Sequence, residues 1–145
     1  MPSKPLDDAY AEMADLILNI SRLIRLRTPT GPEVVSLTPN ERQVMRVVDL
    51  FPGSSPTQIA ERTRLQRTNV STALRGLEGK GMVVRSSAGG RSVAVTPTDL
   101  AVSNLQILRA EWSQHLSDAL PGELADVRRC NELLSRLELN LTSGG

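Results

Sequence analysis

Apolar residues recur at gaps of three and four near the start of the chain, which is the spacing of one face of an α-helix. The stripe consists of Leu6, Tyr10, Met13, Ile17, Ile20 and Ile24. It predicts a long first helix from Leu6 onward. The run from Thr28 to Pro32 holds two prolines and a glycine, so we expect the helix to end there.

Two further helices have clear start signals. Thr38 can cap a helix whose first residue is Pro39, and Glu41 stands where a capping box needs a carboxylate. Ser55, Pro56 and Gln58 repeat the pattern. We expect Val44, Val48 and Phe51 on the inner face of the first of these helices, and residues 56–62 in the second.

A fourth helix is predicted over residues 67–80, followed by a hairpin. The inner face of this helix would hold Val70, Ala73, Leu74 and Leu77, and its start is poorly capped by Gln66. Two Val-rich runs, 82–85 and 92–95, flank a Gly-Gly turn and predict two antiparallel strands.

Two long helices complete the chain. Thr96 and Pro97 predict the start of one, with Ala101, Leu105, Leu108, Trp112 and Ala119 on its apolar face. The last helix uses Leu124, Val127, Cys130, Leu134, Leu137 and Leu141. The predicted fold class is therefore mainly α with a small β-hairpin, a winged helix-turn-helix over residues 37–96 between long terminal helices.

Composition excludes several functional classes. The chain has 145 residues, with one cysteine and one histidine, too few for the usual zinc sites. No apolar run reaches the length of a membrane span, so we expect a cytoplasmic protein with no membrane contact. Because no phosphate-binding glycine loop and no nucleophile-base pair is visible, we expect neither an enzyme nor a cofactor.

Charge is unevenly distributed along the chain. Residues 1–61 carry a net −2 and residues 92–145 a net −3, whereas residues 62–91 carry a net +6. A local basic segment is typical of a surface that binds a polyanion, although a solvated charged face would show the same count.

The spacing of the predicted helix-turn-helix favours DNA. With the apolar residues of the fourth helix turned inward, its outer face presents Thr68, Asn69, Ser71, Thr72 and Arg75. Arg67, near the start of the helix, could contact either a base edge or a phosphate. Arginine can pair with guanine, asparagine with adenine, and the threonine methyl can contact thymine in the major groove.

Other residues are candidates for phosphate or minor-groove contact. Thr57 lies at the start of the third helix, with Arg62 and Arg64 near its end, and each could contact a phosphate or be ordinary surface. Arg91 is the charged residue nearest the hairpin tip, where it could enter a narrow minor groove or stay solvated.

Residues 55–62 and 70–85 resemble the MarR family of winged-helix transcription regulators. The segments are Ser-Pro-Thr-Gln-Ile-Ala-Glu-Arg and Val-Ser-Thr-Ala-Leu-Arg-Gly-Leu-Glu-Gly-Lys-Gly-Met-Val-Val-Arg, and Val95-Thr96 resembles the family's "LT" before the long helix that follows the wing. The chain departs from the family at Gly89, where the wing usually has an aspartate that orients its arginine.

The resemblance implies a homodimeric transcription regulator, often a repressor. Residues 1–36 and 97–145 would form the dimerisation region. The two winged helix-turn-helix regions, one from each subunit, would bind a pseudo-palindromic site in double-stranded DNA. A small ligand, often aromatic or anionic, commonly binds between the dimer helices and the winged region. Trp112 and His115 could border such a pocket, or Trp112 could be a packing anchor with His115 beside it.

Two alternatives stay open at this stage. Cys130 lies near Arg128 and Arg129, which favours reactivity, but its place on the apolar stripe favours a buried small side chain. The winged helix could also be a protein-interaction module whose basic face binds an acidic partner. The small polar residues of the outer face favour DNA over such a partner.

Overall fold

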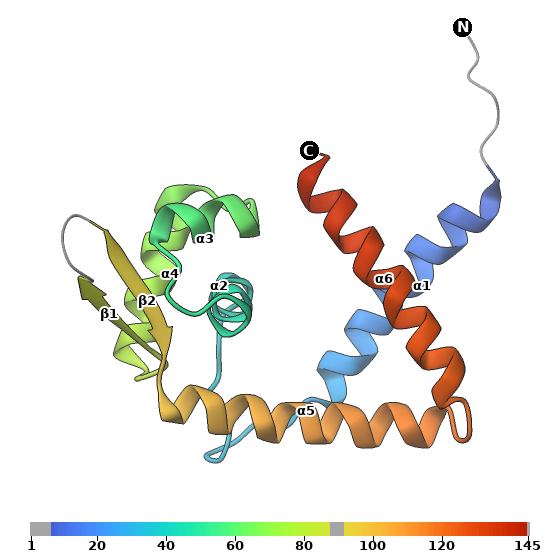
Figure 1. The fold of residues 1–145 in the computed structure, drawn as a ribbon. Coiled ribbons are helices and arrows are strands. Elements are labelled where there is room, and N and C mark those ends of the chain that lie inside the picture. Colours follow the sequence, from blue (N-terminus) through green and yellow to red (C-terminus); the bar gives the residue numbers. More distant parts are fainter. Residues whose placement is uncertain (1–6, 88–91, 145) are drawn as a thin grey trace, which may run out of the picture.

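The computed structural model describes residues 7–87 and 92–144 (Figure 1). The helices are α1 (Asp8–Arg27), α2 (Pro39–Leu50), α3 (Pro56–Thr63), α4 (Arg67–Gly79), α5 (Asp99–Ala119) and α6 (Leu124–Ser143). The strands β1 (Val83–Ser87) and β2 (Val93–Pro97) form one antiparallel hairpin. The predicted fold class is confirmed. Leu6, which the sequence places in the first helix, lies outside the described residues.

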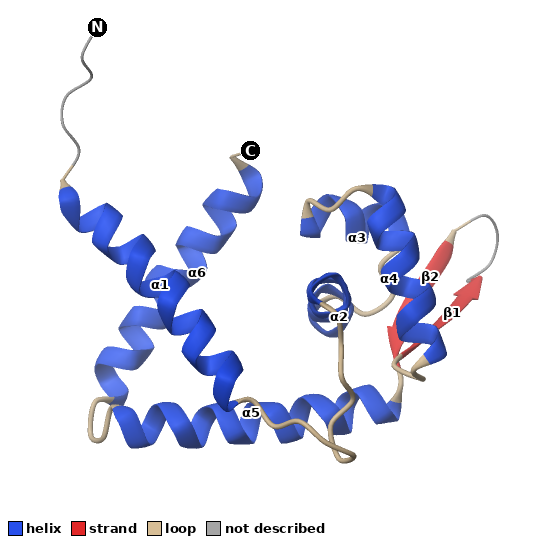
Figure 2. Ribbon diagram, turned by 180° about the vertical axis from the view of Figure 1, so that it is seen from behind, coloured by secondary structure: helices blue, strands red, loops and turns tan. Residues whose placement is uncertain are grey.

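The winged part and the terminal helices occupy opposite ends of α5. Helices α2, α3 and α4 gather with the hairpin at the N-terminal end of α5, while α1 and α6 lie toward its other end (Figures 1 and 2). Helix α5 therefore connects two differently built regions.

The hydrophobic core lies within the winged part. Its fully buried large side chains are Val44, Val48, Ile59, Val70, Leu74, Leu77, Met82 and Val95. The hairpin pairs Val83 with Pro97 at its base, and Ser54 forms an additional antiparallel bridge with Val95. This bridge ties the segment between α2 and α3 to the wing.

The predicted capping boxes are present at both helix starts. Thr38 Oγ1 accepts from the backbone N–H of Glu41, and Ser55 Oγ accepts from that of Gln58. The predicted start of the fifth helix at Thr96 and Pro97 is wrong by two residues. Pro97 ends β2, and the cap is Thr98, whose Oγ1 accepts from the N–H of Ala101. Strand pairing extends through Pro97, the register partner of Val83, and the N–H of Thr98 then donates to the carbonyl of Met82 at 3.1 Å, so the helix begins only after Thr98.

The prediction that Phe51 belongs to the inner face of α2 is also wrong. Phe51 is the C-terminal cap of that helix, its backbone is no longer helical, and its side chain is 45% exposed. The helical period stops applying where the helix ends, so the ring is turned out of the core.

None of the helices in the described ranges is long and apolar enough to cross a membrane.

Candidate nucleic-acid interface

Helix α4 has one buried and one exposed face. Val70, Ala73, Leu74 and Leu77 are buried, as the sequence predicts. The exposed residues include all six side chains of this helix that are predicted to contact DNA: Arg67, Thr68, Asn69, Ser71, Thr72 and Arg75. Figure 2 shows α4 on the outside of the molecule between α3 and the hairpin. The helix therefore presents a continuous polar surface to solvent.

Hydrogen bonds along α4 organise part of this surface. Thr72 Oγ1 donates to the carbonyl of Thr68, and Arg75 Nη2 donates to Thr72 Oγ1 over 3.4 Å. The side chain of Gln66 makes no capping hydrogen bond, which agrees with the weak start signal in the sequence. The first backbone N–H groups of α4 are thus not occupied by a side-chain cap.

The start of α3 offers less to a phosphate than the sequence suggests. Pro56 has no N–H, and the N–H of Gln58 is already bonded to Ser55 Oγ at 3.1 Å. Among the first three residues of α3, the N–H of Thr57 remains, and its side chain is exposed.

Arg62 is held against the segment that precedes α3. Its guanidinium lies 3.9 Å from the centroid of the Phe51 ring, and Nη1 donates to Ser54 Oγ at 3.0 Å. Ser54 is buried and also donates to the carbonyl of Phe51. Arg62 therefore has a fixed position, although the residue as a whole stays exposed.

Arg64 occupies the turn between α3 and α4 in the left-handed conformation, with φ of 63°. It is the C-terminal cap of α3, and its Nη1 donates to the backbone carbonyl of Thr142 in α6 at 2.9 Å. The structure thus places this arginine against the C-terminal helix.

Two other basic residues of the +6 segment have structural partners. Lys80 Nζ donates to Glu41 Oε1 at 2.6 Å and to the carbonyl of Ser36 at 2.8 Å. Burial of the Glu41 carboxylate raises its pKa, but the hydrogen bonds from Lys80 and Thr38 outweigh burial, so the pKa is lowered overall. Arg85 is paired with Glu78. The basic surface is therefore smaller than the sequence count implies.

Arg91, predicted as the minor-groove arginine of the wing, lies outside the described residues, as does Gly89. The strands on either side of it form the predicted hairpin.

The connector between α1 and α2 forms a small pocket with α5. Two long-range hydrogen bonds hold this connector: Trp112 Nε1 donates to Thr28 Oγ1, and Asn104 Oδ1 accepts from the N–H of Val35. Asn104 is 5% exposed, and sequence reasoning did not single it out, because a lone asparagine within a helix gives no signal of a distant partner.

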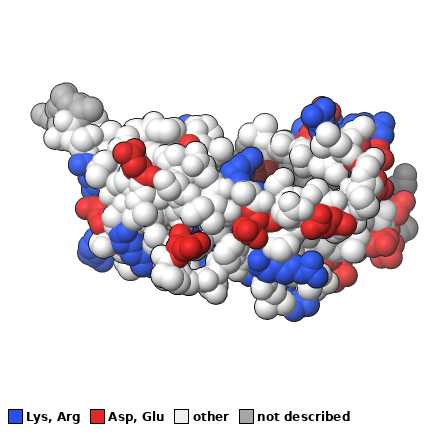
Figure 3. Space-filling model, turned by 90° about the horizontal axis from the view of Figure 1, so that it is seen from below, with Lys and Arg blue, Asp and Glu red and all other residues white. Residues whose placement is uncertain are grey.

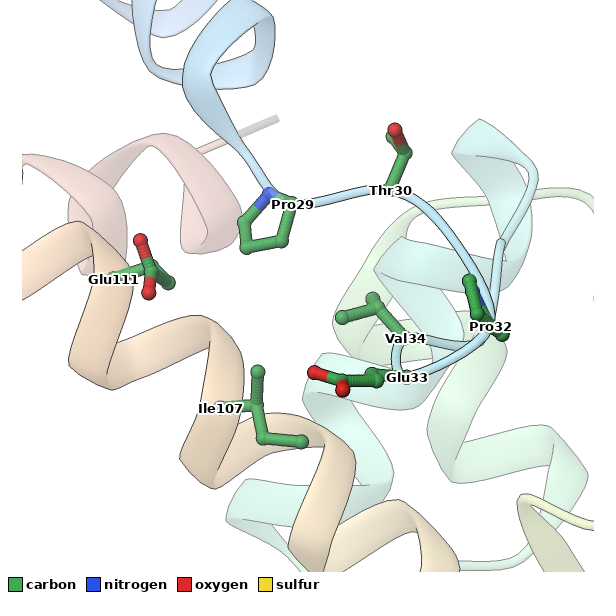
Figure 4. A pocket seen from close by; sticks show the side chains of 7 residues that line it. All are labelled: Pro29, Thr30, Pro32, Glu33, Val34, Ile107 and Glu111. Carbon is green, nitrogen blue, oxygen red and sulfur yellow. The ribbon is translucent and has the colours of Figure 1, made fainter.

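The pocket has a volume of about 240 Å³ (Figure 4). Its lining residues are Pro29, Thr30, Pro32, Glu33, Val34, Ile107 and Glu111. Trp112 and His115, which the sequence suggests as border residues, are not among them, but His115 lies 3.7 Å from the Glu111 carboxylate. Apolar side chains thus share the pocket with two carboxylates.

The terminal helices leave much apolar surface uncovered in the single chain. Neither α1 nor α6 contains a buried residue. Their exposed large hydrophobic residues include Leu16, Leu18, Ile20, Leu23, Leu26, Leu124, Leu133, Leu134, Leu139 and Leu141. Cys130 is exposed as well, so the prediction that it is buried is wrong for the single chain. The apolar stripe of α6 is only partly covered there: Val127 and Leu137 are half-buried, whereas Leu134 is exposed. Seen from the α5 side, acidic and basic groups are interspersed (Figure 3).

Comparison with known structures identifies the fold. A MarR-like transcriptional regulator from Thermotoga maritima superposes with a TM-score of 0.67 and 20% identity over 95% of this chain and 99% of that one. A candidate transcriptional regulator from Pseudomonas aeruginosa gives a TM-score of 0.72 and 23% identity over 92% and 97%. The chain therefore has the fold of the winged-helix transcriptional regulators.

A family model matches the winged part of the sequence. Residues 35–92 match the model of the MarR family. A MarR family protein from Mycobacterium tuberculosis, solved with p-aminosalicylic acid, is 25% identical over 84% of this chain and 97% of that one, with a TM-score of 0.58. The resemblance seen in the sequence is confirmed. No curated protein matches the sequence significantly.

Proposed function

We propose that this protein is a dimeric, sequence-specific DNA-binding transcriptional regulator, a repressor that a small ligand releases from DNA. The observation that carries the proposal is the outer face of α4, where six polar or basic side chains are exposed together opposite four buried apolar ones. A helix of this kind, presented on a winged helix-turn-helix, has the dimensions and chemistry to enter the major groove.

The residues of α4 have distinct proposed roles. Arg75 and Asn69 carry side chains that can form two-pronged hydrogen bonds with guanine and adenine, while Thr68, Ser71 and Thr72 can contact either base edges or phosphates. We propose that Arg67, at the start of the helix, contacts either a base edge or a phosphate. We propose Thr57 and Arg62 as phosphate contacts, with Arg91 in the minor groove, and we treat Arg64 separately below.

A homodimer is supported by the apolar faces of α1 and α6. Helices of 20 residues with no buried side chain expose more apolar surface than a monomer usually tolerates. A second copy of the same helices would cover that surface and relate the two α4 helices by a two-fold axis. Under this proposal residues 1–36 and 97–145 dimerise, residues 37–96 bind DNA, and the protein acts in the cytoplasm.

The ligand proposal rests on the pocket between the α1–α2 connector and α5. All of the lining residues lie on α5 or on the connector that leads from α1 into α2, so an occupant would act on the winged region through these two segments. Glu33 and Glu111 line it, and none of its lining residues is basic. An uncharged or cationic aromatic ligand is therefore favoured over the anionic ligand that the family resemblance suggests.

Selection of duplexes from a random-sequence library by the purified protein tests the proposal. We expect enrichment of one site with two inverted half-sites whose centres lie about 10 bp apart. Arg109→Ala, a charge-matched variant on α5, should select the same site. If the protein retains no duplex above background at low salt, the DNA proposal is wrong and the protein-interaction alternative takes its place.

A further inference from the structure

Two contacts join the winged part to the C-terminal end of α6. Arg64 Nη1 donates to the carbonyl of Thr142 at 2.9 Å, and Arg46 Nη2 lies 3.0 Å from Glu138 Oε2. Residues 64 and 142 are 78 positions apart in the chain, and residues 46 and 138 are 92 apart. One contact comes from the turn between α3 and α4 and the other from α2. We call this pair of contacts the α6 tether.

Arg64 is an unusual residue for its position. Among the described residues it is the sole non-glycine residue with a positive φ, a conformation that glycine or asparagine adopts at lower cost. A non-glycine residue keeps this strained backbone conformation only where surrounding contacts enforce it, and such positions cluster at functional sites. The contact that an arginine supplies here, and that glycine could not, is the hydrogen bond to α6.

The end of α6 also requires such a partner. The last four carbonyls of a helix lack intrahelical donors, and cations stabilise this negative end of the helix dipole. Helix α6 has no basic residue in its own last turn. The guanidinium of Arg64 therefore supplies, from the other region of the molecule, the cation that the sequence of α6 does not provide.

We propose that Arg64, Arg46 and Glu138 are positioning residues. Their tether fixes the winged part against α6 and thereby sets the separation of the two α4 helices in the dimer. This inference rests on the proposed function, because the separation of the two α4 helices affects DNA binding only if the dimer binds two half-sites at once. In this account Arg64 acts through α6 and is not a phosphate contact.

A first experiment tests the tether without DNA. Hydrogen exchange of the free protein is followed at the amides of Arg64 and Leu65 and in the last turn of α6. Arg46→Gln and Glu138→Gln should both speed exchange at these amides. Glu132→Gln, a matched loss of one carboxylate on α6 with no ion pair among the described residues, should leave it unchanged. Unchanged exchange in Arg46→Gln and Glu138→Gln would overturn the tether, whether or not the protein binds DNA.

A second experiment tests its consequence on DNA. The site selected from the random library is compared with the same site lengthened by one base pair between its half-sites. The Kd for the lengthened site divided by the Kd for the original site, here called the spacing ratio, measures sensitivity to half-site spacing. Because exposed ion pairs have small energies, we expect Arg46→Gln, Glu138→Gln and Arg64→Gln to lower this ratio by a factor of about 2–5. Arg46→Gln and Glu138→Gln change the net charge in opposite directions, so a bulk charge effect would move affinity oppositely while the tether moves the spacing ratio the same way.

Salt dependence separates the tether from a phosphate contact. If Arg64 contacts a phosphate, Arg64→Gln lowers the slope of log affinity against log salt by about one. The tether predicts an unchanged slope. A lowered slope in Arg64→Gln together with an unchanged spacing ratio in Glu138→Gln would overturn the inference, whereas absence of any DNA binding by the wild type would refute the proposed function and leave the exchange result standing.

Discussion

Gly76 in α4 lies directly against the carboxylate of Glu41 in α2. A Cβ atom added at Gly76 would overlap Glu41 Oε2. This carboxylate belongs to a residue that is 4% exposed, and it is held by Lys80 Nζ at 2.6 Å and by the backbone N–H of Thr38 at 2.8 Å. Glycine normally costs a helix about 1 kcal/mol relative to alanine, so its place within α4 has a packing cause.

Gly76→Ala should destabilise the protein despite the better helix propensity of alanine. The new methyl must displace a buried carboxylate from its lysine and its helix cap, and we expect a net loss of about 1–3 kcal/mol. Urea unfolding followed by circular dichroism measures the change.

The same substitution should have the opposite sign when Glu41 is absent. In a Glu41→Ala background the overlap is removed, and Gly76→Ala should stabilise by up to about 1 kcal/mol through helix propensity. An equal loss of stability in both backgrounds would show that the Glu41 contact is not the cause.

Asp49 gives the stability a predictable pH dependence. Burial raises the pKa of this half-buried carboxyl on α2 from 3.8 to about 6. Because the folded pKa exceeds the unfolded one, the native protein binds more protons between these values, and the contribution of Asp49 to stability falls as pH rises through that window. Above pH 6 or so the carboxylate is charged in both states, and its burial lowers the free energy of unfolding by an amount that no longer changes with pH.

Asp49→Asn should therefore stabilise the protein by roughly 1–3 kcal/mol at pH 8 and by little at pH 4. The measurement is the difference in unfolding free energy between variant and wild type at both pH values. A stabilisation that does not change between the two would contradict the assigned cause.

The apolar faces of α1 and α6 predict a dimer that single charges can break. Ile20→Glu or Leu134→Glu should shift the protein to a folded monomer, because a buried unpaired carboxylate opposes association by several kcal/mol. Sedimentation equilibrium reports the mass. Leu50→Glu places the same charge on an exposed leucine of the winged part and should leave the dimer intact.

The two glutamates of the pocket predict the charge of its ligand. An aromatic cation such as benzylamine should bind more tightly than p-aminosalicylate. Glu111→Gln should reduce the difference in affinity between the two compounds. Isothermal titration calorimetry of both compounds against wild type and variant tests this. Tighter binding of p-aminosalicylate to the wild type would show that the carboxylates do not govern selection.

Local signals in the sequence were sufficient to predict most elements of the fold. The capping boxes at Thr38 and Ser55 and the inward stripe of α4 depend on neighbours within one or two helical turns, and each is found in the structure. The start of α5 was misplaced because Thr96 and Thr98 both precede a helix-compatible residue. Strand pairing with β1, a tertiary contact, decides between them.

The candidate site was predicted less completely, for the same reason. Exposure of the α4 face follows from helical period, but the partners of the arginines and of Lys80 depend on long-range contacts. Lys80 reaches Glu41, and Arg64 reaches Thr142, across 39 and 78 residues. Nothing in the local pattern at either position indicates these contacts, and a count of charges in one segment cannot distinguish a paired cation from a solvated one.

The central claim, that the outer face of α4 reads DNA sequence, is tested most directly by fluorescence anisotropy of Arg75→Ala on the selected site and on a scrambled duplex. Wild type should bind the selected site at least about a thousandfold more tightly than the scrambled one. Arg75→Ala should weaken the free energy of binding to the selected site by about 1–3 kcal/mol, and should weaken binding to the scrambled duplex by less. Arg109→Ala should not weaken binding to the selected site more than binding to the scrambled duplex. Equal losses on both duplexes would contradict the account.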